Sequence, residues 1–233
     1  MSDLDKIGQL AVAAGGIVSL DARAVRASVA VTEKAGAADL GRPTPCGDWT
    51  LADLLAHMAG QHDGFAAAAA GRGADPAVWR PRPPPADGRA DGRADGRDDG
   101  RGDPVAQYAA AAERVLAAFA ADTGTAGGVL DGEFVLPEID PAARFPAGLA
   151  IGFHFIDYVV HGWDVARSLG LDYELEPDLL GVALAVAEAV PDDDRARRRP
   201  GAAFAPPVSA PAGARPLDRV VALLGRTPGW RAG

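Results

Sequence analysis

The chain has 233 residues, 48% of them hydrophobic, which is enough for one large domain or one domain with a small appendage. Its formal net charge of −9 argues against general nucleic-acid binding, and no apolar run reaches the ~18–20 residues of a membrane span. The single cysteine excludes an intramolecular disulfide and the N-terminus lacks the basic start of a signal peptide, so we expect a cytoplasmic protein.

Apolar residues at helical spacing predict a first helix over 3–36, broken at its Gly-Gly pair. Alanine dominates the apolar residues and aromatic residues are few, which favours closely packed helices over a β-sandwich. The segment GRPTPCGDW interrupts the helical pattern, because its prolines cannot continue a helix. Thr50 followed three residues later by Asp53 forms a capping box, which predicts the next helix over 51–70.

Residues 71–103 contain a repeated ADGR motif that is rich in glycine and proline and poor in large apolar side chains. Such a segment buries too little surface to offset the entropy of ordering it, which predicts a mobile insert. A helix is predicted to resume over 104–121. The run VLDGEFVL places an Asp-Gly turn between short apolar stretches, which is typical of a small hairpin.

The remaining chain predicts a long buried helix over 146–169, another helix over 177–189, and a short last helix in PLDRVVALLGR. A proline- and arginine-rich segment between the last two helices is predicted to be a solvated linker. The predicted organisation is a helix bundle over 1–189, and a linker with one short packed helix over 190–233.

The stretch HFIDYVVHGWD places His154, Asp157 and His161 on one face of an apolar helix. Polar groups on a buried face need partners, and a metal ion is one candidate. His57, on the predicted helix 51–70, is a second imidazole that a bundle could bring to the same ion. In a second interpretation, Asp157 acts as a cap or pairs with an arginine such as Arg23 or Arg26.

Two neighbours of these residues have candidate supporting roles. His154 is predicted to lie next to the metal ligands or in the substrate pocket, with direct ligation as the alternative. Asp164 follows His161 by three residues, so it either orients the His161 ring or makes a structural hydrogen bond. His62 is rotated away from His57 and is predicted to face solvent.

The segments RPTPCGDWTLADLLAHM, DYVVHGWDVARSLG and PLDRVVALLGRTPGW resemble those of actinobacterial DinB/YfiT-like metal-binding proteins. More closely, they resemble the group that shares the N-terminal domain of mycothiol-dependent maleylpyruvate isomerase. The resemblance implies an all-α, DinB-like four-helix bundle, here with extra short helices and a small hairpin. It also implies a divalent metal, typically zinc, held by His57, Asp157 and His161.

In two respects the chain departs from the isomerases, which use glutamate where this chain has Asp157 and which carry a separate C-terminal domain. The resemblance implies a metal-dependent transferase or isomerase that uses mycothiol on a small electrophilic substrate. A hydrolase or lyase that uses metal-bound water, and a non-catalytic metal-binding protein, are the alternatives. Bundles of this kind often form homodimers, and we expect neither a nucleic acid nor a membrane as partner.

Overall fold

The structure, a computed structural model, describes residues 16–81, 102–121, 128–199 and 201–232. It is mostly helical, with one two-stranded antiparallel sheet among the described residues. The chain divides into two compact units. We call residues 29–147 the middle unit, and residues 1–28 together with 148–233 the terminal unit. The terminal unit therefore joins the beginning of the chain to its predicted C-terminal segment.

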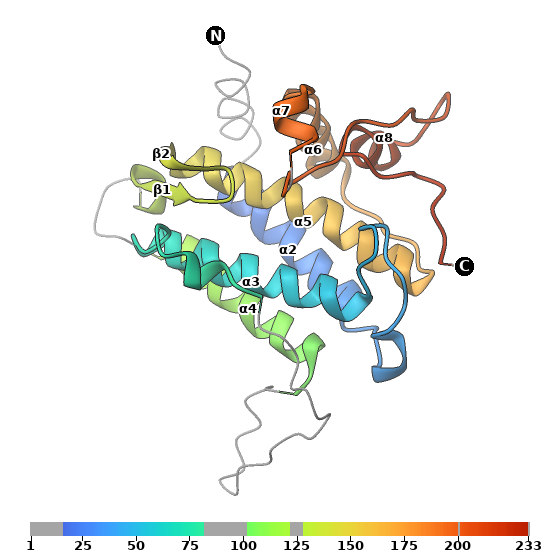
Figure 1. Cartoon of the computed structure of the whole chain (residues 1–233), viewed down its shortest axis with the longest axis horizontal. Helices are drawn as coiled ribbons and strands as arrows, with labels where there is room; N and C mark the ends of the chain where they lie inside the picture. The colour runs from blue at the N-terminus through green and yellow to red at the C-terminus, as the bar shows by residue number, and fades with distance from the viewer. Residues whose placement is uncertain (1–15, 82–101, 122–127, 200, 233) are drawn as a thin grey trace, which may run out of the picture. The chain divides into compact units, whose positions relative to one another are not determined.

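Two long helices, α3 and α4, lie side by side in the middle unit (Figure 1). The hydroxyl of Thr50 accepts a hydrogen bond from the Asp53 N–H, and the Asp53 carboxylate accepts one from the Thr50 N–H, so the predicted capping box begins α3. Asp103 caps α4, and the following proline occupies its first turn. The predicted helices over 51–70 and 104–121 are confirmed as α3, Leu51–Ala69, and α4, Pro104–Ala120.

Trp79 anchors the chain that follows α3 to the side of that helix. It ends the short helix η2, Pro76–Trp79, and its side chain is buried against Gly64 and at an edge-to-face angle to Phe65. Its indole N–H donates to the carbonyl of Gly73 at 2.8 Å. The burial of this large aromatic side chain makes residues 71–81 part of the folded unit, which corrects the predicted start of the insert at residue 71. The mobility predicted for the rest of the insert falls on residues 82–101, outside the described residues.

A small hairpin completes the middle unit, and its turn is not at the predicted position. Strand β1, Glu133–Leu136, pairs antiparallel with β2, Asp140–Pro146, and the turn between them follows Leu136, whose carbonyl accepts from the Ile139 N–H. The Asp-Gly pair instead ends the short helix η3, Gly128–Asp131, just before β1. The predicted hairpin is therefore confirmed, whereas its predicted Asp-Gly turn is wrong because EFVL is the first strand.

The terminal unit is built on α5, Ala147–Leu169, in which every residue from 158 to 166 is buried. Gly170 follows it with a φ of +71°, the left-handed conformation that ends many helices, as the sequence predicts. The helix α2, Ile17–Thr32, begins just after the predicted break, and the part of the predicted first helix before residue 16 lies outside the described residues.

The chain after α5 forms α6, α7 and α8 in that order. Helices α6 and α8 lie beside one another (Figure 1), and α7 is a short helix in the segment that joins them. Arg197 in α7 corrects the predicted solvated linker, because its side chain is buried and donates to the carbonyls of Val190, Pro191 and Ala205. Backbone carbonyls thus satisfy a cation that the sequence places in a polar run. The three helices span Pro177–Ala189, Asp194–Arg197 and Pro216–Leu223.

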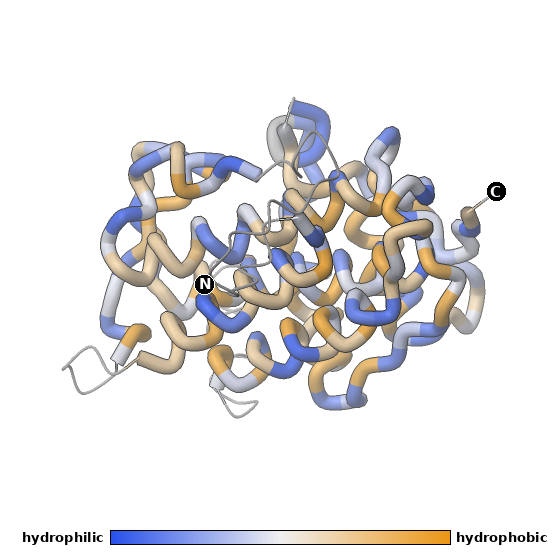
Figure 2. The backbone as a smooth tube through the Cα atoms, turned by 90° about the horizontal axis from the view of Figure 1, so that it is seen from below, coloured by the Kyte–Doolittle hydropathy of each residue, from blue (hydrophilic) through white to orange (hydrophobic). Residues whose placement is uncertain are grey.

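Hydropathy alternates along the helices, which show apolar and polar stretches in turn in Figure 2. Helices with such a pattern can turn apolar residues toward a core and polar residues toward water, whereas α5 is buried on all sides over residues 158–166. Within the part of the chain that the structure describes, no helix is both long enough and apolar enough to cross a bilayer.

Replacing Gly64 by alanine should destabilise the protein, because the new Cβ would lie 2.2 Å from the Trp79 ring. Overpacking of this kind costs about 1–3 kcal/mol of unfolding free energy. Gly181, in α6, is the matched control because its Cβ would meet nothing within 4 Å. Gly181→Ala should leave stability unchanged or raise it by up to about 1 kcal/mol. Urea denaturation measures both, and equal effects would contradict the close packing of Trp79 on α3.

Candidate metal centre

The residues that could bind a metal are divided between the two units. Asp157, His161 and Asp164 lie on α5 in the terminal unit, whereas His57 on α3 and Cys46 in the preceding loop belong to the middle unit. Each unit therefore has its own candidate ligands.

Asp157 and His161 form the clearest candidate ligand pair. Their positions four residues apart on α5 bring the Asp157 Oδ1 and the His161 Nε2 to 3.4 Å from one another. Two atoms bound to one tetrahedral metal at ~2.0–2.1 Å lie about 3.3–3.4 Å apart. The side chains are 20% and 6% exposed, so the pair is shielded but can be reached from outside. The donor chemistry and the spacing both fit zinc or a similar divalent ion.

Asp164 fixes the orientation of the His161 ring. Its Oδ2 lies 3.0 Å from the His161 Nδ1, and because an ionised carboxylate can only accept, Nδ1 carries the proton and donates. In this tautomer Nε2, on the Asp157 side of the ring, carries the lone pair that a metal ligand needs. The hydrogen bond predicted between Asp164 and His161 is therefore present, whereas a role of Asp164 beside a bound metal stays a prediction.

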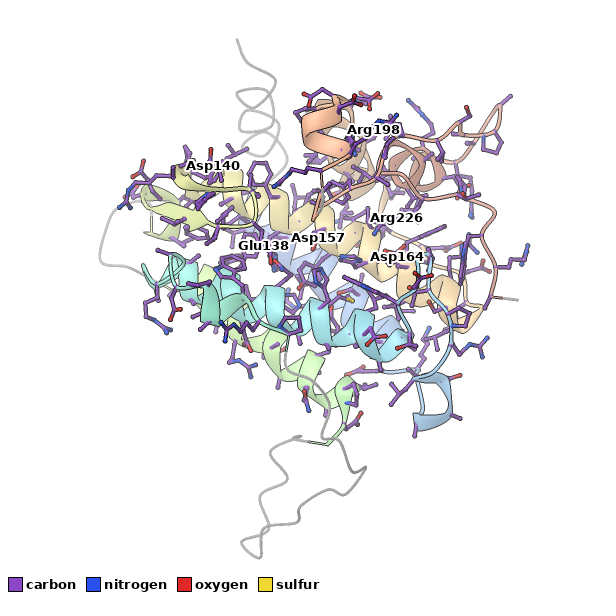
Figure 3. The ribbon with its side chains drawn as sticks, in the orientation of Figure 1. Glu138, Asp140, Asp157, Asp164, Arg198 and Arg226 are labelled. Carbon is purple, nitrogen blue, oxygen red and sulfur yellow. The ribbon has the colours of Figure 1, made fainter. Side chains whose placement is uncertain are left out.

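Asp164 stays ionised although it is completely buried. Burial acts to raise the pKa of this carboxyl, but the charge of Arg226 and the hydrogen bond from His161 outweigh it and lower the pKa to about 2. The Arg226 Nη2 lies 3.0 Å from the Asp164 Oδ2, and Figure 3 labels both residues, one on α5 and the other after α8. The sequence pattern does not indicate Arg226 as a partner of Asp164, although Arg226 lies in the segment PLDRVVALLGRTPGW.

His154 pairs with the carboxylate of Asp21, which lies on α2. Its Nδ1 lies 2.6 Å from the Asp21 Oδ1, both side chains are completely buried, and its ring lies tilted against that of Tyr158, with 4.4 Å between the ring centroids. Burial raises the pKa of Asp21 above its ordinary value. The charge of His154 and its hydrogen bond to Asp21 act to lower this pKa, but the effect of burial is larger. The pair ties α2 to α5 within the terminal unit. The sequence pattern shows Asp21 only as a polar residue at a buried helical position.

Arg23 does not fill the alternative role of a partner for Asp157. Its guanidinium bonds Asp178 at 2.7 Å and also pairs with Glu176, both at the start of α6. Two carboxylates thus already satisfy this arginine. The carboxylate of Asp157 remains available for other partners near His161.

His57 lies on α3 beside an exposed aromatic ring. The ring of Trp49, 38% exposed, stands 4.8 Å from the His57 ring, and His57 itself is half-buried. One helical turn later, the Gln61 amide donates to Glu138 in the hairpin turn at 2.9 Å. The loop before α3 and the hairpin turn are therefore the parts of the middle unit nearest to this face of α3.

His62 is not exposed to solvent as predicted. It is completely buried, and its ring stacks on Tyr108 of α4 with 5.3 Å between the ring centroids. Five residues along a helix rotate a side chain by about 140°. His62 therefore does point away from His57, but that side of α3 is covered by α4 rather than by water.

The chain is similar to a known family of proteins and to relatives from a mycobacterium. The family model of the mycothiol maleylpyruvate isomerase N-terminal domain matches residues 22–166. Uncharacterized proteins from two strains of Mycobacterium tuberculosis are each 32% identical over 205 residues, which is 88% of this chain and 94% of each relative. No solved structure matches the chain. The matched range includes His57, Asp157 and His161, whereas Arg226 lies beyond its end.

Removing one member of the buried pair should destabilise the protein strongly. Asp21→Ala leaves the completely buried His154 without its carboxylate, and breaking a buried pair in this way costs about 3–5 kcal/mol. Asp178→Ala, which breaks the solvent-exposed pair with Arg23, should have a much smaller effect. Thermal unfolding followed by circular dichroism measures both, and a wild-type melting temperature for Asp21→Ala would contradict the pairing.

The ionised Asp164 should make stability depend on acid. Its folded pKa of about 2 lies below the ordinary value of 3.8, so the unfolded state takes up its proton first as the pH falls. The contribution of Asp164 is fully present above about pH 4 and is lost as the pH falls through about 2. The stability difference between wild type and Asp164→Asn, measured in urea, should therefore shrink between pH 5 and pH 2. A constant difference would mean that Asp164 is not ionised in the folded protein.

Proposed function

This chain belongs to the family of the mycothiol maleylpyruvate isomerase N-terminal domain, and on that premise we propose that it is a divalent-metal-dependent enzyme. The reaction that we propose joins the thiol mycothiol to a small electrophilic substrate, as a transferase or as an isomerase. The observation that carries the proposal is the pair of Asp157 and His161, at a spacing that suits one metal, with the His161 ring oriented by Asp164.

The proposed ligands are His57, Asp157 and His161, with zinc as the metal. The proposal follows the family pattern of one histidine on the second principal helix, and a carboxylate and a histidine four residues apart on a later helix. We also propose that the helices form the four-helix bundle that this family pattern implies. Two imidazoles and one carboxylate would leave one or more coordination positions for water or a thiol.

A bound divalent metal would lower the pKa of a thiol or water in its open position and so supply a nucleophile near neutral pH. The chain's own residues have supporting parts. Asp164 holds the His161 ring, and Trp49 offers an aromatic face beside His57 that suits the apolar part of a ligand.

The proposed reaction needs no oxidant, reductant or other reagent besides the thiol and the substrate. In a transfer, the thiol sulfur forms a bond to the electrophilic carbon while either a carbon–carbon double bond opens or the bond to a leaving group breaks. The thiol proton passes to the neighbouring carbon in the first case, and to the leaving group or solvent in the second. In an isomerisation the former double bond rotates, and the sulfur–carbon bond then breaks with loss of the same proton, so the thiol is regenerated. The shorter Asp157, where the isomerases have glutamate, supports a related electrophile as substrate rather than maleylpyruvate itself.

Purified protein should contain about one zinc or similar ion per chain, and His57→Ala, Asp157→Ala and His161→Ala should each lower that content. Each variant removes one of three ligands, and a divalent ion is held weakly by two. His62→Phe is the matched control, because it removes another α3 histidine and keeps a ring to stack on Tyr108. Elemental analysis by mass spectrometry gives the stoichiometry, and metal retention by all three ligand variants would contradict the site.

Turnover of an electrophile panel should require both the metal and mycothiol, and His161→Ala should abolish it. Consumption of the free thiol, followed with a thiol reagent, and product analysis by mass spectrometry distinguish transfer from isomerisation. Turnover without thiol that still needs His161 would indicate the hydrolase or lyase alternative. Metal removal that only lowers the melting temperature, with no turnover under any condition, would indicate a non-catalytic metal-binding protein.

A further inference from the structure

We propose that Arg226 is a positioning residue of the metal centre, since it holds Asp164 where that carboxylate fixes the tautomer of His161. This inference rests on the proposed function, because it assigns a role toward the same metal. It extends the centre into a part of the chain that the family match, which ends at residue 166, does not cover.

Arg226 and His161 share one oxygen of Asp164. The Arg226 Nη2 donates to the Asp164 Oδ2 at 3.0 Å, and the His161 Nδ1 approaches the same oxygen at 3.0 Å. The Arg226 Nε lies 3.4 Å from the other oxygen, so the guanidinium approaches both oxygens of the carboxylate. Arg226 is 9% exposed and Asp164 is completely buried, so water does not compete effectively for these contacts.

The end of α8 places Arg226 in this position. Gly225 has a φ of +82°, its N–H bonds the Ala222 carbonyl, and the Arg226 N–H bonds the Val221 carbonyl. These two bonds are the Schellman motif, which ends a helix and turns the following residue back along it. A side chain at Gly225 would also strike Ala205, with a Cβ contact of 2.6 Å. The Gly-Arg pair after α8 thus fixes the backbone from which the guanidinium reaches α5.

Loss of Arg226 would change which nitrogen of His161 carries the proton. Without the guanidinium, Asp164 loses the two contacts with Arg226 that hold it in place, and His161 loses a fixed acceptor for its Nδ1–H. The other tautomer would then donate from Nε2 toward the Asp157 Oδ1, which lies 3.4 Å away. A proton on Nε2 blocks the lone pair that the proposed metal needs. A purely structural ion pair between Arg226 and Asp164 would have no such effect on His161.

The test compares wild type with Arg226→Met and Arg226→Lys, and uses Arg219→Met as the control. Methionine keeps an apolar stem, lysine also keeps the charge but not the two-pronged geometry, and Arg219 is an exposed α8 arginine that bonds Glu188. Circular dichroism establishes that each variant folds. If Arg226→Met does not fold, Arg226→Lys carries the comparison.

Nitrogen-15 NMR of the metal-free chain reads the tautomer of His161, assigned by the signal lost in His161→Gln. We expect Nδ1–H in wild type and Arg219→Met, and a mixture with Nε2–H in Arg226→Met. Competition with a chromophoric zinc chelator measures the affinity for Zn²⁺ alone. We expect about ten- to a hundredfold weaker binding in Arg226→Met and a smaller loss in Arg226→Lys.

The two measurements separate this inference from the proposed function. Wild-type zinc binding with an unchanged His161 tautomer in the folded Arg226 variants overturns the inference and leaves the proposed function standing. A changed tautomer with unchanged zinc affinity overturns it as well. No zinc binding by wild type overturns the metal-dependent function itself, whatever the tautomer.

Discussion

The burial of α5 is the constraint on which the rest of the terminal unit depends. A polar side chain on a buried helix is tolerated only when another group neutralises or hydrogen-bonds it. His154 meets this requirement with Asp21 from α2, and Asp164 meets it with His161 and Arg226. The polar partners of α5 thus come from both ends of the chain, which explains why the two chain ends belong to one compact unit. Asp157 is the more exposed carboxylate of the helix and faces the accessible nitrogen of His161.

Local sequence signals predicted the elements well, because capping and turn residues act over a few positions. The Thr50 capping box set the start of α3, Pro177 set the start of α6, and Gly170 marked the end of α5. The three-residue spacing of His161 and Asp164 likewise indicated that these two side chains could reach one another, and they lie 3.0 Å apart. In these cases the interacting groups lie within one helical turn, so the geometry follows from helix parameters alone.

The predictions that failed depended on groups far away in the sequence. Helical rotation placed His62 away from His57 but could not show that Tyr108 covers that side of α3. Arg197 lies in a polar run, and only the fold shows that three carbonyls surround it. Asp21 and Arg226 were missed as partners of His154 and Asp164 for the same reason, since an isolated charge in the sequence does not indicate its partner. The hairpin turn was misplaced because an Asp-Gly pair suits a helix end as well as a turn.

The position of Arg226 is set by the contact of α8 with α6 and by the left-handed glycine before it. The chain between these two helices also takes part, because Ala205 packs against Gly225 and the Val208 N–H donates to the Ala222 carbonyl. Homologous proteins should therefore tolerate insertions and deletions between α6 and α8 only where these contacts and the Gly-Arg pair are kept. A polypeptide that stopped after α6 would keep both carboxylates and both imidazoles of α5, yet the buried anion Asp164 would lack the counter-charge of Arg226. The C-terminal segment, predicted from the sequence as a linker with one short helix, thus supplies the cation that neutralises a buried carboxylate of α5.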